Sequence, residues 1–542
     1  MASVQLPAAP YAESAVADAP TLDASTVRAS SAEQQASGDR LRQSRAAQSE
    51  WSALPIQRRL GVLRRIRHGL AAQAQELTAL VAASSGRPTA EALSGEVLPL
   101  LDAGRFLERQ AARSLAARRL GIAGRPLWLN VPASEVQRVA YGVVLILGPA
   151  NNPLFIPGVQ CLQALAAGNA VWLKPGTGTG AVAERFARIA ADAGLDPRLL
   201  QVWPDSTEAG REAAAAGVDK VVLTGAAETG RTVLAQLAPR LTPATLELSG
   251  SDAVIIRADA DLAMTVNALL FGLRFNHGTA CIAPRRVFIQ RERAAELEAN
   301  LIADLQPLPL STSCNAPAQA AAEAVIEALG LGARLLTGKL GSDGALAWPV
   351  VLAGTRPEIR MMRESYGLPI LTITDVDSDD QAVAGINACP YRLGAAIFSA
   401  NETAARKLAG QLHCGVVTIN DLMVPTADPR LPFGGYGMSG YGVTRGLEGL
   451  LEMTRPKVIT ISRGSWRPHF DTALTSDECG FHQYLQIGHA GSALKRLRAF
   501  IGLAGYLLWT NLTQPTRRPF FRRSLLKPTN EQISPEDRKS TG

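Results

Sequence analysis

Residues 143–149 read Val-Val-Leu-Ile-Leu-Gly-Pro, a short apolar run that stops at a glycine and a proline. Such a run is typical of a strand that is buried on both faces of a parallel sheet. After it, helical patterns at 159–167 and 181–193 alternate with apolar strand patterns at 170–173 and 220–223. This alternation predicts an α/β fold with a doubly wound parallel sheet, in which ligands bind at the carboxyl ends of the strands.

A second alternating region extends from about Leu246 to Gly435, and no internal repeat is evident. A second α/β domain is therefore expected there, because 542 residues exceed the size of one hydrophobic core. Its strands are expected at 253–256, 286–289, 370–374, 395–398 and 416–419.

The composition is that of a soluble globular enzyme, with 47% hydrophobic and 19% charged residues. The net charge of +7 is modest for this length and does not indicate a nucleic-acid binder. Six scattered cysteines without a CxxC pair predict neither a metal site nor a disulfide framework. With no secretory signal pattern and no apolar run of about 20 residues, a cytoplasmic location is expected.

Two residues stand out as candidates for covalent chemistry. Cys281 closes the segment Phe-Asn-His-Gly-Thr-Ala-Cys at the end of an apolar helical stretch. Most single cysteines are small buried hydrophobes, but the polar neighbours and Gly278 favour a nucleophile here. Glu247 lies in Leu-Glu-Leu-Ser-Gly, between apolar residues. It is either a satisfied core carboxylate or a catalytic base whose pKa is raised by burial.

Polar residues follow the strands of the first domain. Asn151, after the strand at 143–147, either forms a turn or donates its amide to an oxyanion. Lys174 ends the next strand and offers a cation suited to a ribose or a phosphate. The segment 224–230 opens a helix whose N-terminus is a candidate pyrophosphate site, although its glycine spacing is a weak signal alone.

In this order and spacing, the motifs resemble those of the aldehyde dehydrogenase superfamily over about residues 50–462. The resemblance implies that Cys281 attacks the aldehyde carbon and that Asn151, with the Cys281 backbone N–H, forms the oxyanion hole. It also implies that Glu247 activates the water that hydrolyses the thioester left after hydride transfer. Members that pass the acyl group to coenzyme A typically lack this Glu, so a free acid is the expected product.

The resemblance further implies NAD or NADP as cofactor. The implied cofactor-binding residues are Lys174, Thr177, Thr224, Gly225, Gly230, Glu364 and Tyr366, and a late glycine-rich segment, 432–440, is expected to line the active site. A catalytically silent homologue and a coenzyme A-dependent acylating enzyme are the alternatives.

The sequence departs from the family pattern at four places. The family usually has Glu at the position of Thr177; without that carboxylate a 2′-phosphate is not repelled, so NAD and NADP both stay open. Ser249 replaces a glycine, and His277 and Thr279 replace residues that are often Gln. Leu368 separates Gly367 from Pro369, where Pro commonly follows Gly directly.

The resemblance divides the chain into five parts. We expect a flexible tail over 1–45 (at most helical near its end), an NAD(P)-binding domain over 46–246 and a catalytic domain over 247–445. A return segment with an oligomerisation strand follows over 446–464, which implies a homodimer or homotetramer. A C-terminal extension covers 465–542.

This extension carries an apolar stretch, 499–509, with basic residues on both sides. It is too short to cross a bilayer, so it either lies in a membrane interface or docks on protein. A peripheral membrane location would suit a long-chain or isoprenoid-type aldehyde. Leu269, Leu270 and Phe271 are then candidates to face an apolar tunnel, whereas Arg274 would instead meet an acidic substrate.

Overall fold

The computed structural model describes residues 31–126, 133–305, 311–312, 316–341, 345–462, 470, 475 and 477–513. These residues fall into two compact units. The first lies within Met1–Ser114 and Ala140–Thr454, and the second lies within Leu115–Val139 and Arg455–Gly542.

The first sheet of the larger unit is the predicted doubly wound sheet. Its strand order is β18-β7-β6-β3-β4-β5, and all neighbours are parallel except β18, which is antiparallel to β7. The chain enters at β3, runs outward to β5 and returns to β6 on the other side of β3. A ligand crevice is expected where the order reverses, between β3 and β6. The strands are β3 (Val143–Leu147), β4 (Ala170–Lys174), β5 (Leu200–Val202), β6 (Lys220–Gly225), β7 (Ala244–Leu248) and β18 (Gly440–Tyr441).

Helices pack around this sheet, and α6 between β3 and β4 is buried at every position. The helices that follow the strands are α6 (Phe155–Ala166), α7 (Gly180–Asp192), α8 (Thr207–Ala215), α9 (Ala227–Leu237) and α15 (Gly446–Glu452), with short turns η2 (Pro197–Leu199) and η3 (Ala238–Arg240). Those that precede it are α1 (Ser31–Ala53), α2 (Ile56–Ala72), α3 (Ala74–Ser85), α4 (Thr89–Ala92), the π turn η1 (Leu93–Val97) and α5 (Leu98–Ser114).

The last part of the expected tail, residues 31–45, is helical and packs within the larger unit. Helix α1 begins at Ser31, and it buries Leu41 and Ser44. The Ser44 hydroxyl accepts a hydrogen bond from the Trp172 indole of β4 (2.9 Å), and the Trp51 indole donates to Leu165 O (2.9 Å). Contacts with distant residues therefore stabilise a helix that has no apolar stripe in its own sequence.

The second sheet has the order β10-β12-β13-β9-β8-β15-β16. Within it, each strand from β12 onward is parallel to the next strand in this order. All five predicted strands are confirmed, whereas β11 and β12 were not expected. The strands are β8 (Asp252–Ile256), β9 (Pro284–Gln290), β10 (Ser311–Thr312), β11 (Arg334–Leu340), β12 (Leu346–Ala353), β13 (Ile370–Val376), β15 (Gly394–Phe398) and β16 (Val416–Ile419).

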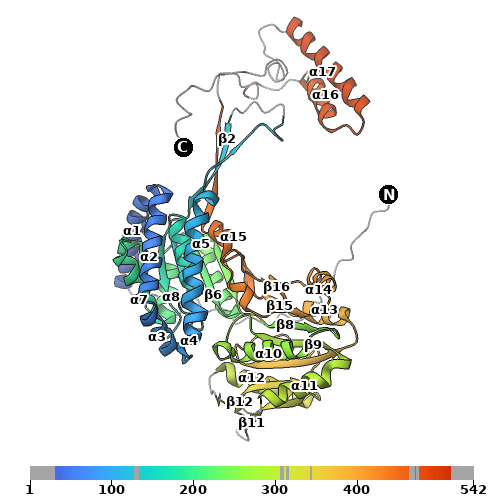
Figure 1. Ribbon diagram of the computed structural model, residues 1–542. Helices are drawn as coiled ribbons and strands as arrows, with labels where there is room; N and C mark the ends of the chain where they lie inside the picture. Colours follow the sequence, from blue (N-terminus) through green and yellow to red (C-terminus); the bar gives the residue numbers. More distant parts are fainter. Residues whose placement is uncertain are drawn as a thin grey trace. The chain divides into compact units, whose positions relative to one another are not determined.

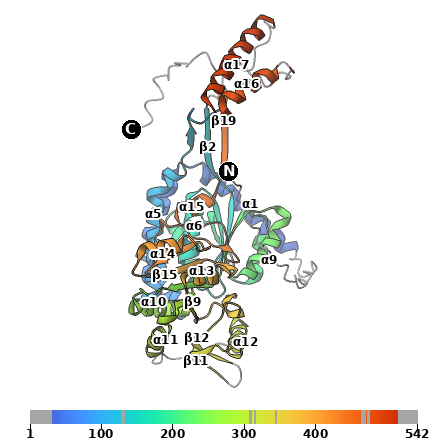
Figure 2. The ribbon, with the colours of Figure 1, turned by 90° about the vertical axis from the view of Figure 1, so that its right-hand side faces the viewer.

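Helices α10, α11 and α12 lie beside this sheet in Figure 1, and α14 lies beside β15 in Figure 2. Their bounds are α10 (Leu262–Arg274), α11 (Arg291–Leu305), α12 (Ala316–Gly330), α13 (Asp379–Asn387) and α14 (Glu402–Ala409). Short elements complete the unit: η4 (Phe275–Gly278), η5 (Arg360–Met362), η6 (Val424–Ala427) and the pair β14 (Tyr391–Arg392) with β17 (Tyr436–Gly437).

Glu247 belongs to β7, the last parallel strand of the first sheet. The predicted boundary between residues 246 and 247 therefore cuts a strand. The short link from Ser249 to Ser251 separates β7 from β8, the first strand of the second sheet. A residue near the end of β7 consequently lies where the two sheets meet.

The smaller unit contains a three-stranded sheet and a helix pair. The sheet has the order β1 (Arg118–Leu120), β2 (Ala133–Ala140) and β19 (Thr454–Ile461), so the segment 446–464 does contain a strand, as expected. Helices α16 (Asp477–His489) and α17 (Ala493–Thr513) pack together around Leu503 and Tyr506. Among the described residues, neither these nor any other helix combines the length and apolarity needed to cross a bilayer.

Candidate active site

Cys281 follows a strained turn. Helix α10 ends at Arg274, and the next turn holds Asn276 (φ +52°), His277 (φ +50°) and Gly278 (φ +66°) in the left-handed region. Each non-glycine residue in that region costs about 1–2 kcal/mol, so other contacts must hold the turn.

Three separate elements supply those contacts. The backbone N–H of Asn276 donates to Glu91 Oε1 of α4 (2.8 Å), and the Asn276 side-chain amide donates to the backbone oxygen of Asn151 (2.7 Å). From β9, the buried Arg285 donates to Gly278 O (2.5 Å). The position of the thiol is thus fixed from outside its own loop.

The structure places Asn151 beside the Cys281 loop. Its side-chain amide donates to Thr279 O (2.8 Å), two residues before the thiol. The segment after β3 is held in turn by the buried Glu96, whose Oε2 accepts from the backbone N–H groups of Leu154 (3.0 Å) and Phe155 (2.7 Å).

Glu96 is itself neutralised by a buried ion pair. Its Oε1 lies 2.5 Å from Arg87 Nη2, and both side chains are fully buried. Burial raises the pKa of Glu96, while Arg87 and the two backbone N–H groups act against that rise. Neither residue could be recognised from the sequence, since an isolated Arg or Glu near a helix start usually faces solvent.

Glu247 is buried, with 2% of its surface exposed. Its Oε2 accepts from the Thr444 hydroxyl (2.6 Å), and its Oε1 has no hydrogen-bond partner among the described residues. Burial raises the pKa of this carboxyl, and Arg445 and Thr444 act against that rise. A buried carboxylate with one free oxygen is equipped to accept a proton.

Cys281 opens onto a cavity of about 630 Å³. Its wall is mostly apolar, and three charged side chains, Glu91, Arg274 and Arg445, also line it. Of the predicted tunnel residues, Phe271 lines the cavity, but Leu269 and Leu270 are buried in the core below α10. The apolar and aromatic lining comprises Pro99, Phe155, Ile156, Phe271, Phe275, Ile282, Met423, Val424 and Phe433.

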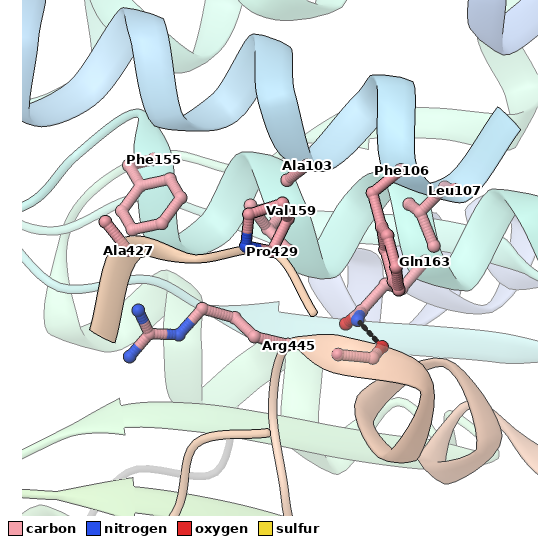
Figure 3. Close-up of a pocket in the computed structure, with 10 residues that line it drawn as sticks. Ala103, Phe106, Leu107, Phe155, Val159, Gln163, Ala427, Pro429 and Arg445 are labelled. Carbon is pink, nitrogen blue, oxygen red and sulfur yellow. Dashed lines mark hydrogen bonds between the residues drawn. The ribbon is translucent and has the colours of Figure 1, made fainter. Parts of the chain in front are cut away.

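A second cavity of only about 10 Å³ shares Phe155, Ala427 and Arg445 with this wall. Figure 3 shows these side chains together with Gln163, whose amide donates to Gly446 O (3.1 Å). This bond ties the start of α15 to α6, so the residue before α15, Arg445, is anchored beside the larger cavity.

The surroundings of the Cys281 thiol oppose its ionisation. Burial raises its pKa to about 12, and the carboxylates of Glu247 and Asp252 act in the same direction. The guanidinium of Arg445 acts against them. Asp252 and Arg445 carry no motif in the sequence, and their relation to Cys281 exists only in the folded chain.

Lys174 and Thr177 meet a carboxylate that the sequence reasoning missed. Asp205, after β5, accepts from the Gly178 N–H (2.7 Å), and its backbone oxygen accepts from the Thr177 hydroxyl (3.3 Å). Burial lowers the pKa of Lys174 and Asp205 acts against this fall. One cation and one carboxylate therefore stand beside Thr177 at the carboxyl ends of β4 and β5.

The N-terminus of α9 fits a pyrophosphate. Gly225 ends β6, and the N-cap residue Ala226 offers no side-chain acceptor, which leaves the first N–H groups of the helix to a ligand. A Cβ at Gly230 would lie 2.8 Å from Leu248 Cδ1, so glycine lets α9 lie close to β7.

The hydroxyl of Thr224, one of the expected cofactor-binding residues, has a partner within the protein. Thr224 is buried, and its hydroxyl accepts a hydrogen bond from the Gln160 amide (3.1 Å). The side chain therefore joins β6 to α6.

The Glu364 and Tyr366 segment approaches from the second sheet. The Tyr366 hydroxyl donates to Glu364 Oε2 (2.7 Å), and the Ser365 hydroxyl donates to Gly250 O (2.7 Å). Gly250 also passes so close to Cys281 that a Cβ there would lie 2.6 Å from Cys281 O. The structure thus links this segment, the end of β7 and the thiol.

Comparisons with known proteins agree with this geometry. The model of the aldehyde dehydrogenase family matches residues 12–459. A 4,4′-diapolycopene aldehyde oxidase from Methylomonas sp is 32% identical over 77% of this chain and 80% of that protein. The betaine aldehyde dehydrogenase of Sinorhizobium fredii is 29% identical over 77% of this chain and 88% of that protein.

Solved structures give the same result. An NAD-dependent aldehyde dehydrogenase from Sinorhizobium meliloti superposes with a TM-score of 0.75 at 26% identity, over 82% of this chain and 89% of that one. The NADP-dependent glyceraldehyde-3-phosphate dehydrogenase of Bacillus halodurans C-125 superposes with a TM-score of 0.72 at 28% identity, over 79% and 91%.

The family model matches most of the length of the chain, and the fold is a doubly wound sheet with a cysteine that follows an apolar helix. The chain therefore belongs to the aldehyde dehydrogenase family. It is an oxidoreductase that oxidises aldehydes with NAD or NADP.

Proposed function

We propose that the protein oxidises a lipophilic aldehyde to a free carboxylic acid through a thioester on Cys281. The observation that carries this proposal is the position of Cys281 on the wall of a mostly apolar cavity of about 630 Å³. The buried Glu247, with one oxygen free among the described residues, lies within electrostatic reach of that thiol.

In the first half of the reaction, the Cys281 thiolate bonds to the aldehyde carbon and forms a tetrahedral thiohemiacetal. The Asn151 amide and the Cys281 backbone N–H stabilise its oxyanion, for which Asn151 exchanges its bond to Thr279 O (2.8 Å). A bound nicotinamide would supply the acceptor for the hydride that leaves this adduct. Lys174, Gly225 and the N-terminus of α9 would hold the rest of the dinucleotide.

In the second half, Glu247 accepts a proton from water, and the resulting hydroxide adds to the thioester carbon. The carbon–sulfur bond then breaks and returns the Cys281 thiolate. One aldehyde, one water and the oxidised cofactor yield a carboxylate, the reduced cofactor and two protons. The presence of Glu247 favours this hydrolysis over the alternative in which coenzyme A accepts the acyl group.

The cavity lining supports an apolar substrate. Aromatic and aliphatic side chains from α6, α10 and η6 dominate its wall. Transfer of such a substrate from water gains about 0.8 kcal/mol for each buried methylene. The name of the Methylomonas relative, an oxidase of 4,4′-diapolycopene aldehyde, supports the same class.

The test measures reduced cofactor formed from NAD⁺ and NADP⁺ with aldehydes from two carbons to long chains. We expect kcat/KM to rise with chain length and to vanish in Cys281→Ala. Cys479→Ala is the matched control, since Cys479 is an exposed thiol of the smaller unit. Turnover that survives in Cys281→Ala would overturn the proposed nucleophile, and a preference for short, charged aldehydes would overturn the substrate class.

We also propose that α17 rests on an anionic lipid surface. Its exposed leucine and isoleucine side chains recur at spacings of three, four and seven, opposite the buried face formed by Leu503 and Tyr506. Exposed basic residues accompany this apolar stripe, which suits a negatively charged interface. The stripe comprises Leu494, Leu497, Ile501, Leu508 and Leu512, and the basic residues are Lys495, Arg496 and Arg498.

Co-sedimentation of the full chain with vesicles tests this surface. Binding is expected with phosphatidylserine-containing vesicles, not with pure phosphatidylcholine, and Ile501→Asp with Leu508→Asp should abolish it. Leu241→Asp, at an even more exposed apolar position of the larger unit, should bind normally. If the double variant instead splits an oligomer without changing vesicle binding, the stripe is an interface between copies.

We retain the predicted homodimer or homotetramer as part of the proposal. Strand β19 is at the edge of its sheet and exposes Val458 and Ile461. An edge strand with apolar side chains is suited to pairing with another chain. Light scattering of Val458→Lys should show a smaller species than the wild type, and an unchanged mass would contradict this assignment.

A further inference from the structure

Arg445 has a backbone conformation that is unfavourable for an arginine. Its φ of 59° and ψ of 176° fall in a region populated almost only by glycine. The residue directly precedes α15, and it follows Thr444, whose hydroxyl donates to Glu247. Strain of this kind persists only where surrounding contacts impose it.

Those contacts bury the guanidinium in the cavity wall. Its carbon lies 3.9 Å from the ring centroid of Phe433 and 5.5 Å from that of Phe155, and its Nη1 donates to Thr426 O (2.8 Å). Only 8% of the residue is exposed. A buried cation is costly without a compensating charge, yet no carboxylate of the described residues lies within ion-pair distance.

The charges that Arg445 meets belong to the proposed reaction centre. Its electrostatic partners are Glu247 and Cys281. The thiol faces two carboxylates, Glu247 on β7 and Asp252 on β8, which both oppose a thiolate. Against them, Arg445 supplies the cation on the cavity side.

The other charged groups near the thiol are engaged elsewhere. Arg285 of β9 is within electrostatic reach of Cys281, but it donates to the backbone oxygens of Leu368, Gly278 and Ala280. Glu91, which lines the cavity from α4, accepts from the Asn276 N–H. Arg274 is exposed and donates to Leu270 O within α10.

We infer that Arg445 is a positioning residue for the reaction: its guanidinium stabilises the Cys281 thiolate and holds the charge of Glu247 beside it. The strained backbone is then explained, because a glycine would fit the conformation but would leave two carboxylates and a thiolate together without a cation. This inference rests on the proposed function, in which Cys281 is the nucleophile.

The test is the pH dependence of Cys281 alkylation by iodoacetamide, which reacts with the thiolate and needs no cofactor or aldehyde. Mass spectrometry of the Cys281 peptide gives the rate. In Arg445→Met the half-point should move to higher pH by about one unit or more, so that alkylation near neutral pH slows about tenfold. Arg445→Lys, which keeps a cation, should stay within about threefold of the wild type.

Arg274→Met is the matched control, because it removes the other arginine of the cavity wall and should leave the half-point unchanged. If Arg445→Met does not fold, as judged by its melting transition, Arg445→Gly repeats the measurement with a residue suited to the backbone. An unchanged half-point in the folded variant would overturn the inference. Wild-type protein that is not alkylated at Cys281 would instead overturn the proposed nucleophile.

Discussion

The side-chain amide of Asn151 donates a hydrogen bond to the carbonyl oxygen of Thr279 at 2.8 Å. This bond joins the end of a strand in the first sheet to the loop that carries the thiol, across 128 residues of sequence. The donor is therefore already aimed at the Cys281 loop, and its amide needs only to exchange acceptors when an oxyanion forms.

Asn151→Ala removes this donor and should lower kcat by about 10²–10³, because a lost oxyanion donor costs roughly 3–4 kcal/mol in the transition state. Cys281 should still be alkylated, since the thiol remains. Steady-state kinetics with one good aldehyde measure the effect. A kcat within threefold of the wild type would remove Asn151 from the oxyanion hole.

Glu247→Gln should separate the two halves of the reaction. Hydride transfer needs no base at this position, so a burst of reduced cofactor equal to the enzyme concentration is expected. Steady-state turnover should then fall by about 10²–10⁴. Stopped-flow absorbance resolves the phases, and Glu402→Gln, at the exposed start of α14, is the control. Loss of the burst itself would contradict the role of Glu247 in hydrolysis alone.

Asp252 makes stability depend on pH. Burial raises the pKa of its carboxyl to about 7, so between about pH 4 and 7 the folded chain keeps a proton that the unfolded chain releases. This contribution to stability is complete below pH 4 and is lost as the pH rises through 7. Asp252→Asn should remove the loss, which is of the order of 2 kcal/mol or more, and urea unfolding at pH 5 and 8 measures it. If the free energy of unfolding changed equally between pH 5 and 8 in the wild type and in Asp252→Asn, the assignment would be contradicted.

Thr177 should set the choice between cofactors together with Asp205. Thr177→Glu adds a second carboxylate next to the one that already accepts from the Gly178 N–H. Because like charges repel, the variant should lose at least about tenfold in kcat/KM with NADP⁺ while it keeps activity with NAD⁺. Thr177→Gln, of the same size without the charge, is the control. An equal loss with both cofactors would show a steric effect.

Local patterns predicted the strands of both sheets, because apolar runs that are buried on both faces are visible in the sequence itself. The strand β12 escaped prediction, and it contains Pro349, a residue that argues against a central strand. Helix α1 escaped because its buried residues pack on β4 and α6, which a polar helical segment does not reveal.

The candidate site was predictable where a residue carries its own motif. Cys281, Glu247 and Asn151 are each recognisable in a short segment. Arg445, Asp205 and Glu96 are not, because their significance comes from charges and backbone groups supplied by distant elements. The hydrogen bond from the Gln160 amide to the Thr224 hydroxyl was likewise not visible in the motif, because Gln160 lies on a different element.

The hydrogen bond between Thr444 and Glu247 spans 197 residues of sequence. A chain emerging from the ribosome therefore contains its thiol and its carboxylate long before the segment that joins them has been synthesised. The contact that holds Glu247 in place is therefore completed late in synthesis, and a chain truncated before Thr444 lacks it.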